Sequence, residues 1–142
     1  MNDGTFKKVE RSDKLLYGPA GIIVCGYAPS EHTSIAGALS KMGLGDRPLI
    51  FATQEDLSRT LAGVLASEDR HGMGVAASMP RAMIMSGFTH KEVHFLMSVY
   101  RKAEMPPQLW ATLTPVSETW TLDALLNELV AEAAAIKKKR RS

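Results

Sequence analysis

The chain repeats part of its own residue pattern at an interval of 61 residues, the interval that separates Gly26 from Gly87. Aligned with itself at that interval, the chain needs no gap between Ile23 and Thr53. The matched pairs include Ile23 with Ile84, Gly26 with Gly87, Glu31 with Glu92, Lys41 with Lys102 and Thr53 with Thr114. An offset held over such a stretch predicts a duplicated supersecondary unit. The chain is therefore expected to contain the same local structure twice.

The first copy has the pattern of strand, helix, strand, helix. A short β-branched run, Ile22–Cys25, is bounded by glycines and predicts a strand that is buried on both faces. Pro29 suits the first position of a helix, which should end at Gly43. Leu49–Ala52 predicts the second strand, and Thr53 is expected to cap the second helix. The apolar residues of that helix are Leu57, Leu61, Val64 and Leu65.

The second copy repeats this order after a linker. Residues 68–80 are rich in glycine and alanine and have neither a helical nor an alternating pattern, so they are the predicted linker. The predicted elements are a strand at Ala82–Met85, a helix capped by Thr89, a strand at Leu109–Leu113 and a final helix capped by Thr121. Trp120 and Leu125 flank that last cap as a hydrophobic staple. Matching Leu57 to Leu125 needs an offset of 68, so the first copy is expected to lack about seven residues.

These elements predict an α/β protein made of two duplicated β-α-β-α units. We expect the units to share one mainly parallel four-stranded sheet packed by helices, because a two-stranded unit alone buries too little. Two separate domains are the alternative. The predicted division is a loosely ordered N-terminal segment at 1–18, a first unit at 19–67, a linker at 68–80, a second unit at 81–136 and a basic tail at 137–142.

The net charge of +2 comes from the end of the chain. Five of the 17 basic residues lie in the run Lys137–Arg141, which leaves 12 basic against 15 acidic residues elsewhere. Because the remainder is acidic, nucleic acid is an unlikely partner by this criterion. The single cysteine fits a reducing compartment, and the apolar runs are too short for a membrane helix. The sequence therefore predicts a cytoplasmic protein without a membrane partner.

The second half, from about Met83 to Glu132, resembles an uncharacterised bacterial domain, the domain-of-unknown-function family 3783. The residues that carry the resemblance are Gly87-Phe88, Lys91-Glu92, Ala111-Thr112-Leu113-Thr114-Pro115, Trp120-Thr121-Leu122, Leu125-Leu126 and Glu128-Leu129. This chain has Ser117 where the family usually has an asparagine between the Thr-Pro pair and the tryptophan. The resemblance implies no known activity and no catalytic or binding residue.

Several patterns suggest chemistry and also have a simpler structural interpretation. Cys25 ends a strand before a helix, where a helix N-terminus can activate a thiol, but a buried structural cysteine is the favoured interpretation. His90 and His94 are one helical turn apart, yet no third metal ligand accompanies them. The segment Gly72–Ala77 has the letters of a dinucleotide-binding loop without a preceding strand. The tryptophans Trp110 and Trp120 are interpreted as packing residues. No cofactor and no metal are expected.

Ligands of parallel sheets bind beyond the carboxyl ends of the strands. In this chain those ends carry the candidate ligand-binding residues Cys25, Gly26, Thr53, Gln54, Ser86, Gly87, Thr112 and Thr114. They offer hydroxyl groups, glycines and backbone amides but no acid–base pair. The first hypothesis is therefore a non-catalytic protein-interaction or regulatory module, with an unidentified protein or a second copy as its partner. The alternative is a small-molecule or nucleotide-binding protein, or an enzyme, that uses these strand ends.

Overall fold

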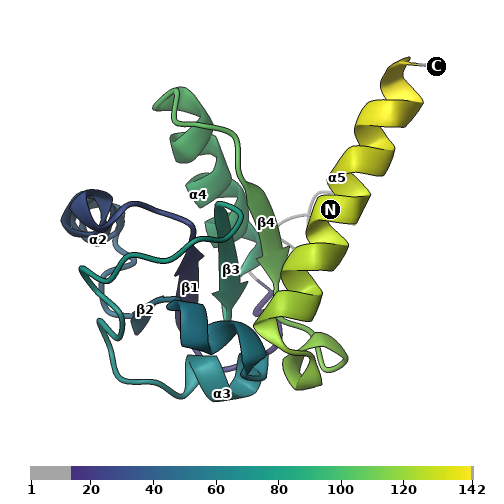
Figure 1. Cartoon of the computed structure of the whole chain (residues 1–142). Helices are drawn as coiled ribbons and strands as arrows, with labels where there is room; N and C mark the ends of the chain where they lie inside the picture. The colour runs from purple at the N-terminus through teal and green to yellow at the C-terminus, as the bar shows by residue number, and fades with distance from the viewer. Residues whose placement is uncertain (1–13, 142) are drawn as a thin grey trace, which may run out of the picture.

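The computed structural model describes residues 14–141. The predicted N-terminal segment therefore lies outside the described residues up to residue 13, as does Ser142. The strands are β1 (Gly21–Cys25), β2 (Leu49–Phe51), β3 (Ala82–Ser86) and β4 (Leu109–Thr112). The helices are α2 (Pro29–Lys41), α3 (Leu61–Leu65), α4 (His90–Lys102) and α5 (Leu122–Arg141), with short 3-10 helices η1 (Gln54–Ser58) and η2 (Ser117–Thr119). Figure 1 shows this arrangement, with the far half of α5 extending away from the rest of the molecule.

The four strands form one sheet in the order β2-β1-β3-β4, as a shared sheet requires. The sheet is mixed, so the expectation of a mainly parallel sheet is wrong. β1 is parallel to β2 and β3 is parallel to β4, but β1 and β3 are antiparallel, with Gly21 opposite Ser86 and Cys25 opposite Ala82. Each βαβ crossover keeps its own strands parallel. The linker, however, brings the chain into β3 at the end of the sheet where β1 finishes, so the second pair runs the other way.

The element boundaries recur at the interval seen in the sequence. β3 and α4 each begin and end 61 residues after β1 and α2, and α5 begins 61 residues after α3. The expected loss of seven residues in the first half is therefore wrong. The helix predicted from Thr53 to Leu65 is instead divided in two, because Arg59 and Thr60 are extended between η1 and α3. A common origin of the two halves stays a prediction.

The sheet has a hydrophobic core on each face, because neighbouring residues in a strand point to opposite faces. Ile22 and Val24 of β1 belong to the core that α2 and α4 cover. Ile23 and Cys25 belong to the other core, which receives Leu61 of α3 and leucines of α5. All five residues of β1 and of β3 are buried, as expected for central strands with helices on both faces. The two halves of the chain thus contribute to both cores.

The linker covers the free edge of β2. The N–H of Arg70 donates to the carbonyl of Leu49 at 2.7 Å, and the N–H of Phe51 donates to the carbonyl of His71 at 2.8 Å. Gly72 has a φ of +74°, and a Cβ atom there would lie 2.0 Å from the Phe51 carbonyl oxygen. The glycine pattern in this segment is therefore explained by close backbone packing against a strand.

Candidate functional site

The predicted strand-end residues do not form one rim. Because β1 and β3 are antiparallel, their carboxyl ends lie at opposite ends of the sheet. One end carries Cys25, the last residue of β1, together with Gly26, Thr53 and Gln54, which follow β1 and β2. The other end carries Ser86 and Thr112, the last residues of β3 and β4, together with Gly87 and Thr114. The structure thus separates the eight candidates into two groups of four, and only members of one group can share a ligand.

Cys25 is completely buried in the core that α3 and α5 cover. Burial raises the pKa of its thiol to about 12, and the nearby Asp56 carboxylate adds to the shift. The thiolate is the nucleophilic form of cysteine, so at neutral pH this side chain is present as an unreactive thiol. The geometry agrees with a structural role for Cys25.

Thr53 and Gln54 use their polar groups within the protein. The Asp56 carboxylate accepts hydrogen bonds from the Thr53 N–H at 2.8 Å and from Arg59 at 2.9 Å, and it lies 3.0 Å from Nε2 of His71. Burial alone would raise the pKa of Asp56, but these hydrogen bonds outweigh it and hold the pKa below its usual value. Gln54 bonds to the backbone of Ser78 with both its amide nitrogen and its amide oxygen. The hydrogen bonds at this end of the sheet therefore hold the linker against η1.

At the opposite end of the sheet, the chain before β1 occupies the space beside Gly87. A Cβ atom on Gly87 would lie 2.8 Å from the Gly18 carbonyl oxygen and from the Ala20 nitrogen. The Thr114 N–H donates to the Ser117 hydroxyl at 3.0 Å, which is the counterpart of the bond from Thr53 to Asp56. Ser117 is buried, so the residue that departs from the family pattern still fills the position structurally.

An arginine that the sequence analysis did not single out organises the end of β1. Arg81 stacks over the ring of Tyr27, with its guanidinium carbon 3.7 Å from the ring centroid. It also donates to both carboxylate oxygens of Glu31, at 3.1 and 3.2 Å, and to the hydroxyl of Tyr100 at 3.0 Å. The hydrogen bonds from Arg81 lower the pKa of Glu31. We call Tyr27, Glu31, Arg81, Tyr100 and Gln108 the Arg81 cluster.

The Arg81 cluster has donors left over. Tyr27 donates its hydroxyl hydrogen to the amide oxygen of Gln108 at 2.7 Å. Within the described residues, the amide nitrogen of Gln108 and Nη2 of Arg81 are buried and have no hydrogen-bond partner. Fifty residues separate Arg81 from Glu31, so no local pattern could have revealed the cluster. The position of an arginine directly before a buried strand was the only available signal.

Two apolar hollows adjoin this cluster. The first, the α2–α4 groove, has a volume of about 380 Å³ and is lined by apolar residues of both helices together with Tyr27, Glu31 and Tyr100. The second, the α5 cleft, has a volume of about 630 Å³ and separates the far half of α5 from the starts of β3 and β4. The α5 cleft is lined by Pro80, Arg81, Pro107, Gln108, Leu109, Val130, Ala133, Ala134, Ile136 and Lys137.

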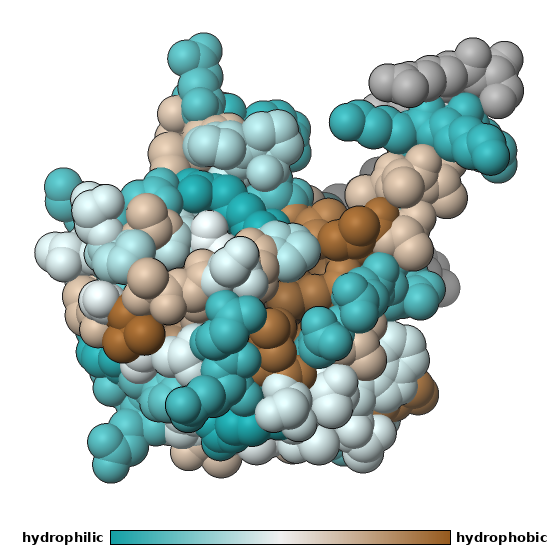
Figure 2. Space-filling view, viewed as in Figure 1, coloured by the Kyte–Doolittle hydropathy of each residue, from teal (hydrophilic) through white to brown (hydrophobic). Residues whose placement is uncertain are grey.

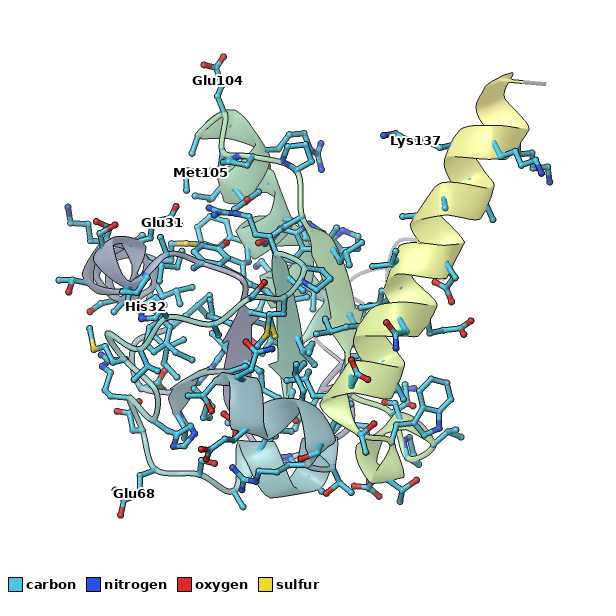
Figure 3. All side chains as sticks on the ribbon, in the orientation of Figure 1. Glu31, His32, Glu68, Glu104, Met105 and Lys137 are labelled. Atoms are coloured by element: carbon cyan, nitrogen blue, oxygen red, sulfur yellow. The ribbon has the colours of Figure 1, made fainter. Side chains whose placement is uncertain are left out.

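The α5 cleft is the larger and the more exposed of the two. Figure 2 shows apolar surface gathered where α5 leaves the rest of the molecule. Val130 and Ile136 are 44% and 55% exposed, which is high for large apolar side chains at a concave surface. Lys137 extends from α5 toward the rest of the molecule (Figure 3), so the α5 wall of the cleft carries a cationic side chain.

The paired histidines and Trp120, which the sequence also offered as candidates, lie at the surface of the protein. His90 and His94 are both exposed on α4, and residues 14–141 contain no group of three His, Cys, Asp or Glu side chains suited to a metal ion. Trp120 is 37% exposed, so it is only a partly buried staple. No helix in the described part of the chain has the length and apolar character to cross a membrane.

Comparison with known proteins gives a family match over residues 81–136. No curated protein and no solved structure matches this chain. The matched segment includes β3, α4, β4, η2 and the greater part of α5, and it includes Arg81 and the whole lining of the α5 cleft apart from Pro80 and Lys137. Residues 81–136 match the model of a family described as a domain of unknown function, DUF3783, which confirms the resemblance seen in the second half of the sequence.

Proposed function

We propose that this chain is a non-catalytic protein-interaction module and that the α5 cleft is its binding surface. The observation that carries the proposal is the exposure of Val130 and Ile136 beside an apolar hollow of about 630 Å³. Exposed apolar surface of this kind is typical of a site that another molecule covers. Regulation of the bound protein is the biological role that fits such a module.

The side chains that could otherwise take part in catalysis support a non-catalytic assignment. The thiol of Cys25 is buried and protonated at neutral pH because burial raises its pKa. The carboxylate of Asp56 is also buried, and it already accepts hydrogen bonds from Thr53 and Arg59. A catalytic group must reach a substrate, and neither of these two groups is accessible to one. A buried free thiol also fits the reducing, cytoplasmic compartment that we propose.

The test compares two charge insertions at exposed apolar positions. Ile136→Glu places a carboxylate in the α5 cleft, whereas Val116→Glu places one at a side chain that is 68% exposed between β4 and α5. Tagged full-length variants would be used to capture partners from native lysate, with quantitative mass spectrometry of the retained proteins. We expect Ile136→Glu to lose a partner that Val116→Glu retains. Equal capture by both variants would contradict the assignment of the cleft.

A second candidate function is the binding of a small acidic molecule at the polar end of the α5 cleft. It is favoured by the two buried donors without partners, Nη2 of Arg81 and the amide nitrogen of Gln108. Both residues line the cleft. Thermal unfolding in the presence of octanoate, compared with octanol, tests it: a rise in midpoint for the carboxylate alone, abolished by Gln108→Glu, is expected. No shift with either compound would leave the protein-interaction proposal in place.

A further inference from the structure

The apolar stripe of α5 continues beyond the part of the helix that the sheet covers. Leu122, Leu126, Leu129, Ala133 and Ile136 follow one another at alternating intervals of four and three residues. This spacing keeps side chains on one seam of a helix and is the pattern of coiled coils. Leu122 and Leu126 are buried against the sheet, whereas Ala133 and Ile136 are exposed. The seam is thus filled by the protein itself over its first half only.

The exposed half of the seam suits another helix. Residues 131 and 133–135 are all alanines, whose small side chains allow a second helix backbone to approach closely. Val130 and Ile136 supply the larger apolar side chains at the ends of this alanine-rich stretch. The opposite wall of the cleft is made of prolines, Arg81, Gln108 and Leu109. A helix lying in the cleft would therefore contact α5 on one side and the starts of β3 and β4 on the other.

The charges on α5 favour an antiparallel second copy of α5 as the partner helix. Asp123, Glu128 and Glu132 occupy its first two-thirds, and all the basic residues, Lys137–Arg141, occupy its end. A helix with the opposite order of charge along the cleft is complementary to this one, and α5 of a second copy has that order when it runs antiparallel. A parallel pair would instead place the two basic segments side by side, which repels.

The register of such a pair follows from the seam. Glu132 and Lys139 are seven residues apart, so both flank the seam on the same side. In an antiparallel pair related by a twofold axis, the same sides of the two helices face each other. A crossing near Ala135, close to the midpoint of residues 132 and 139, brings Glu132 of each copy beside Lys139 of the other, and this happens twice because the interface is symmetric.

We propose that the chain forms a twofold dimer in which the far half of α5 pairs antiparallel with α5 of a second copy. This inference rests on the proposed function, because it names the partner of the same α5 cleft. The interface consists of the exposed seam residues at its centre and the Glu132–Lys139 pairs at its rim.

Light scattering coupled to size-exclusion chromatography tests the dimer on the full chain over a concentration series. We expect a mass of twice the 15.5 kDa of one chain. Ile136→Glu should raise the dimer dissociation constant by more than about tenfold, because it would bury an unpaired carboxylate at the centre of the interface. Val116→Glu, which changes an exposed residue away from the seam, should leave the constant unchanged.

A charge exchange tests the direction of the helices. Glu132→Lys and Lys139→Glu should each weaken the dimer about fivefold, since each creates two like-charge contacts, and an equimolar mixture of the two variants should recover it. A parallel pair would place Glu132 opposite Lys137 instead, so recovery with Lys137→Glu in place of Lys139→Glu would overturn the antiparallel arrangement. Circular dichroism of each variant verifies that α5 remains helical.

The outcomes separate this inference from the proposed function. A monomer at every concentration, or a dimer that Ile136→Glu does not weaken, overturns the inference. If the monomer still captures a different protein through Ile136, the protein-interaction module stands and only the identity of its partner changes. If Ile136→Glu affects neither self-association nor capture, both proposals fail.

Discussion

At the scale of single residues, the chemistry of this protein depends on which polar groups are already engaged. Asp56 and His32 illustrate this: Asp56 is held by Thr53 and Arg59, and Nδ1 of His32 accepts a hydrogen bond from the Gly74 N–H at 2.8 Å. Both are buried. Asp56 joins η1 to His71 of the linker and His32 joins α2 to the linker, so their contribution is to stability.

Alkylation kinetics should show that Cys25 is protected. With a pKa raised to about 12, the native thiol should react with iodoacetamide only as fast as the protein unfolds, at pH 7 and at pH 9 alike. Ser40→Cys, at an exposed position of α2, provides a matched control whose introduced thiol should react rapidly. Rapid labelling of Cys25 in the native wild-type protein would contradict its assignment to the core.

Asp56 should contribute to stability in a pH-dependent way. Its pKa in the folded protein is lowered, so its contribution is present above the unfolded-state pKa, about 3.9, and is lost as the pH falls through the folded value. Asp56→Asn should therefore reduce the free energy of unfolding by about 1.5–3 kcal/mol at pH 7, by loss of charge-assisted hydrogen bonds, and by less at pH 3. Urea unfolding at both pH values measures this. Glu68→Gln, at an exposed position, should give no such difference.

At the scale of elements, α2 and α4 differ in how their first turns are satisfied. Thr89 caps α4, with its hydroxyl accepting from the Glu92 N–H at 3.1 Å while Glu92 accepts from the Thr89 N–H at 2.9 Å. The equivalent residue before α2 is Ala28, whose N–H donates to Glu31 at 2.8 Å. An alanine has no side-chain acceptor, so α2 has half of the capping box.

Exchanging these two caps should move stability in opposite directions. Thr89→Ala should lower the free energy of unfolding by about 1 kcal/mol, and Ala28→Thr should raise it by about 0.5–1 kcal/mol. Ala28 is already extended, with φ of −66° and ψ of 147°, so the new side chain requires no backbone change. Chemical denaturation of the two variants and the wild type provides the comparison. A loss of stability in Ala28→Thr would mean that the added methyl group collides with its surroundings.

The local elements were predictable because their signals are local. The glycine-bounded run around β1, Pro29 at the start of α2 and the cap residue Thr89 before α4 each report on neighbouring residues only, and the structure confirms all three elements. Thr53 does not begin the long helix that it predicts, because the same capping chemistry also begins a short 3-10 helix. Trp120 is more exposed than a packing residue is expected to be, since a staple pattern does not specify how much of the ring is covered.

At the scale of the whole molecule, the direction of β3 relative to β1 was not predictable. Hydrophobic patterns identify strands but carry no information on whether the connection between two strands makes them parallel or antiparallel. A parallel pairing of β1 and β3 was therefore as consistent with the sequence as the antiparallel pairing that the structure has. The candidate site depended on that direction. Two groups of strand-end residues that would meet in a parallel sheet are separated here, and the Arg81 cluster joins residues that are far apart in the sequence.

Because β1 and β3 pair with each other, we expect that neither half of the chain folds alone. The fragment Met83–Ser142 contains nearly all of the segment that matches DUF3783, yet it lacks β1, which pairs along the full length of β3. We expect this fragment to be poorly folded and to show no cooperative thermal transition. Calorimetry of the fragment and of the full chain measures this. Cooperative unfolding of the fragment at the full-length midpoint would support two separate domains.

The way the linker lies along β2 also limits how copies of this protein could assemble. Backbone bonds from Arg70 and His71 occupy one margin of the sheet, while β4 is the last strand at the other. A molecule with two free margins can add neighbours at both and grow into a fibre. Among residues 14–141, the margin left for an additional strand is the one beside β4, so growth by strand addition should stop after a single neighbour has joined.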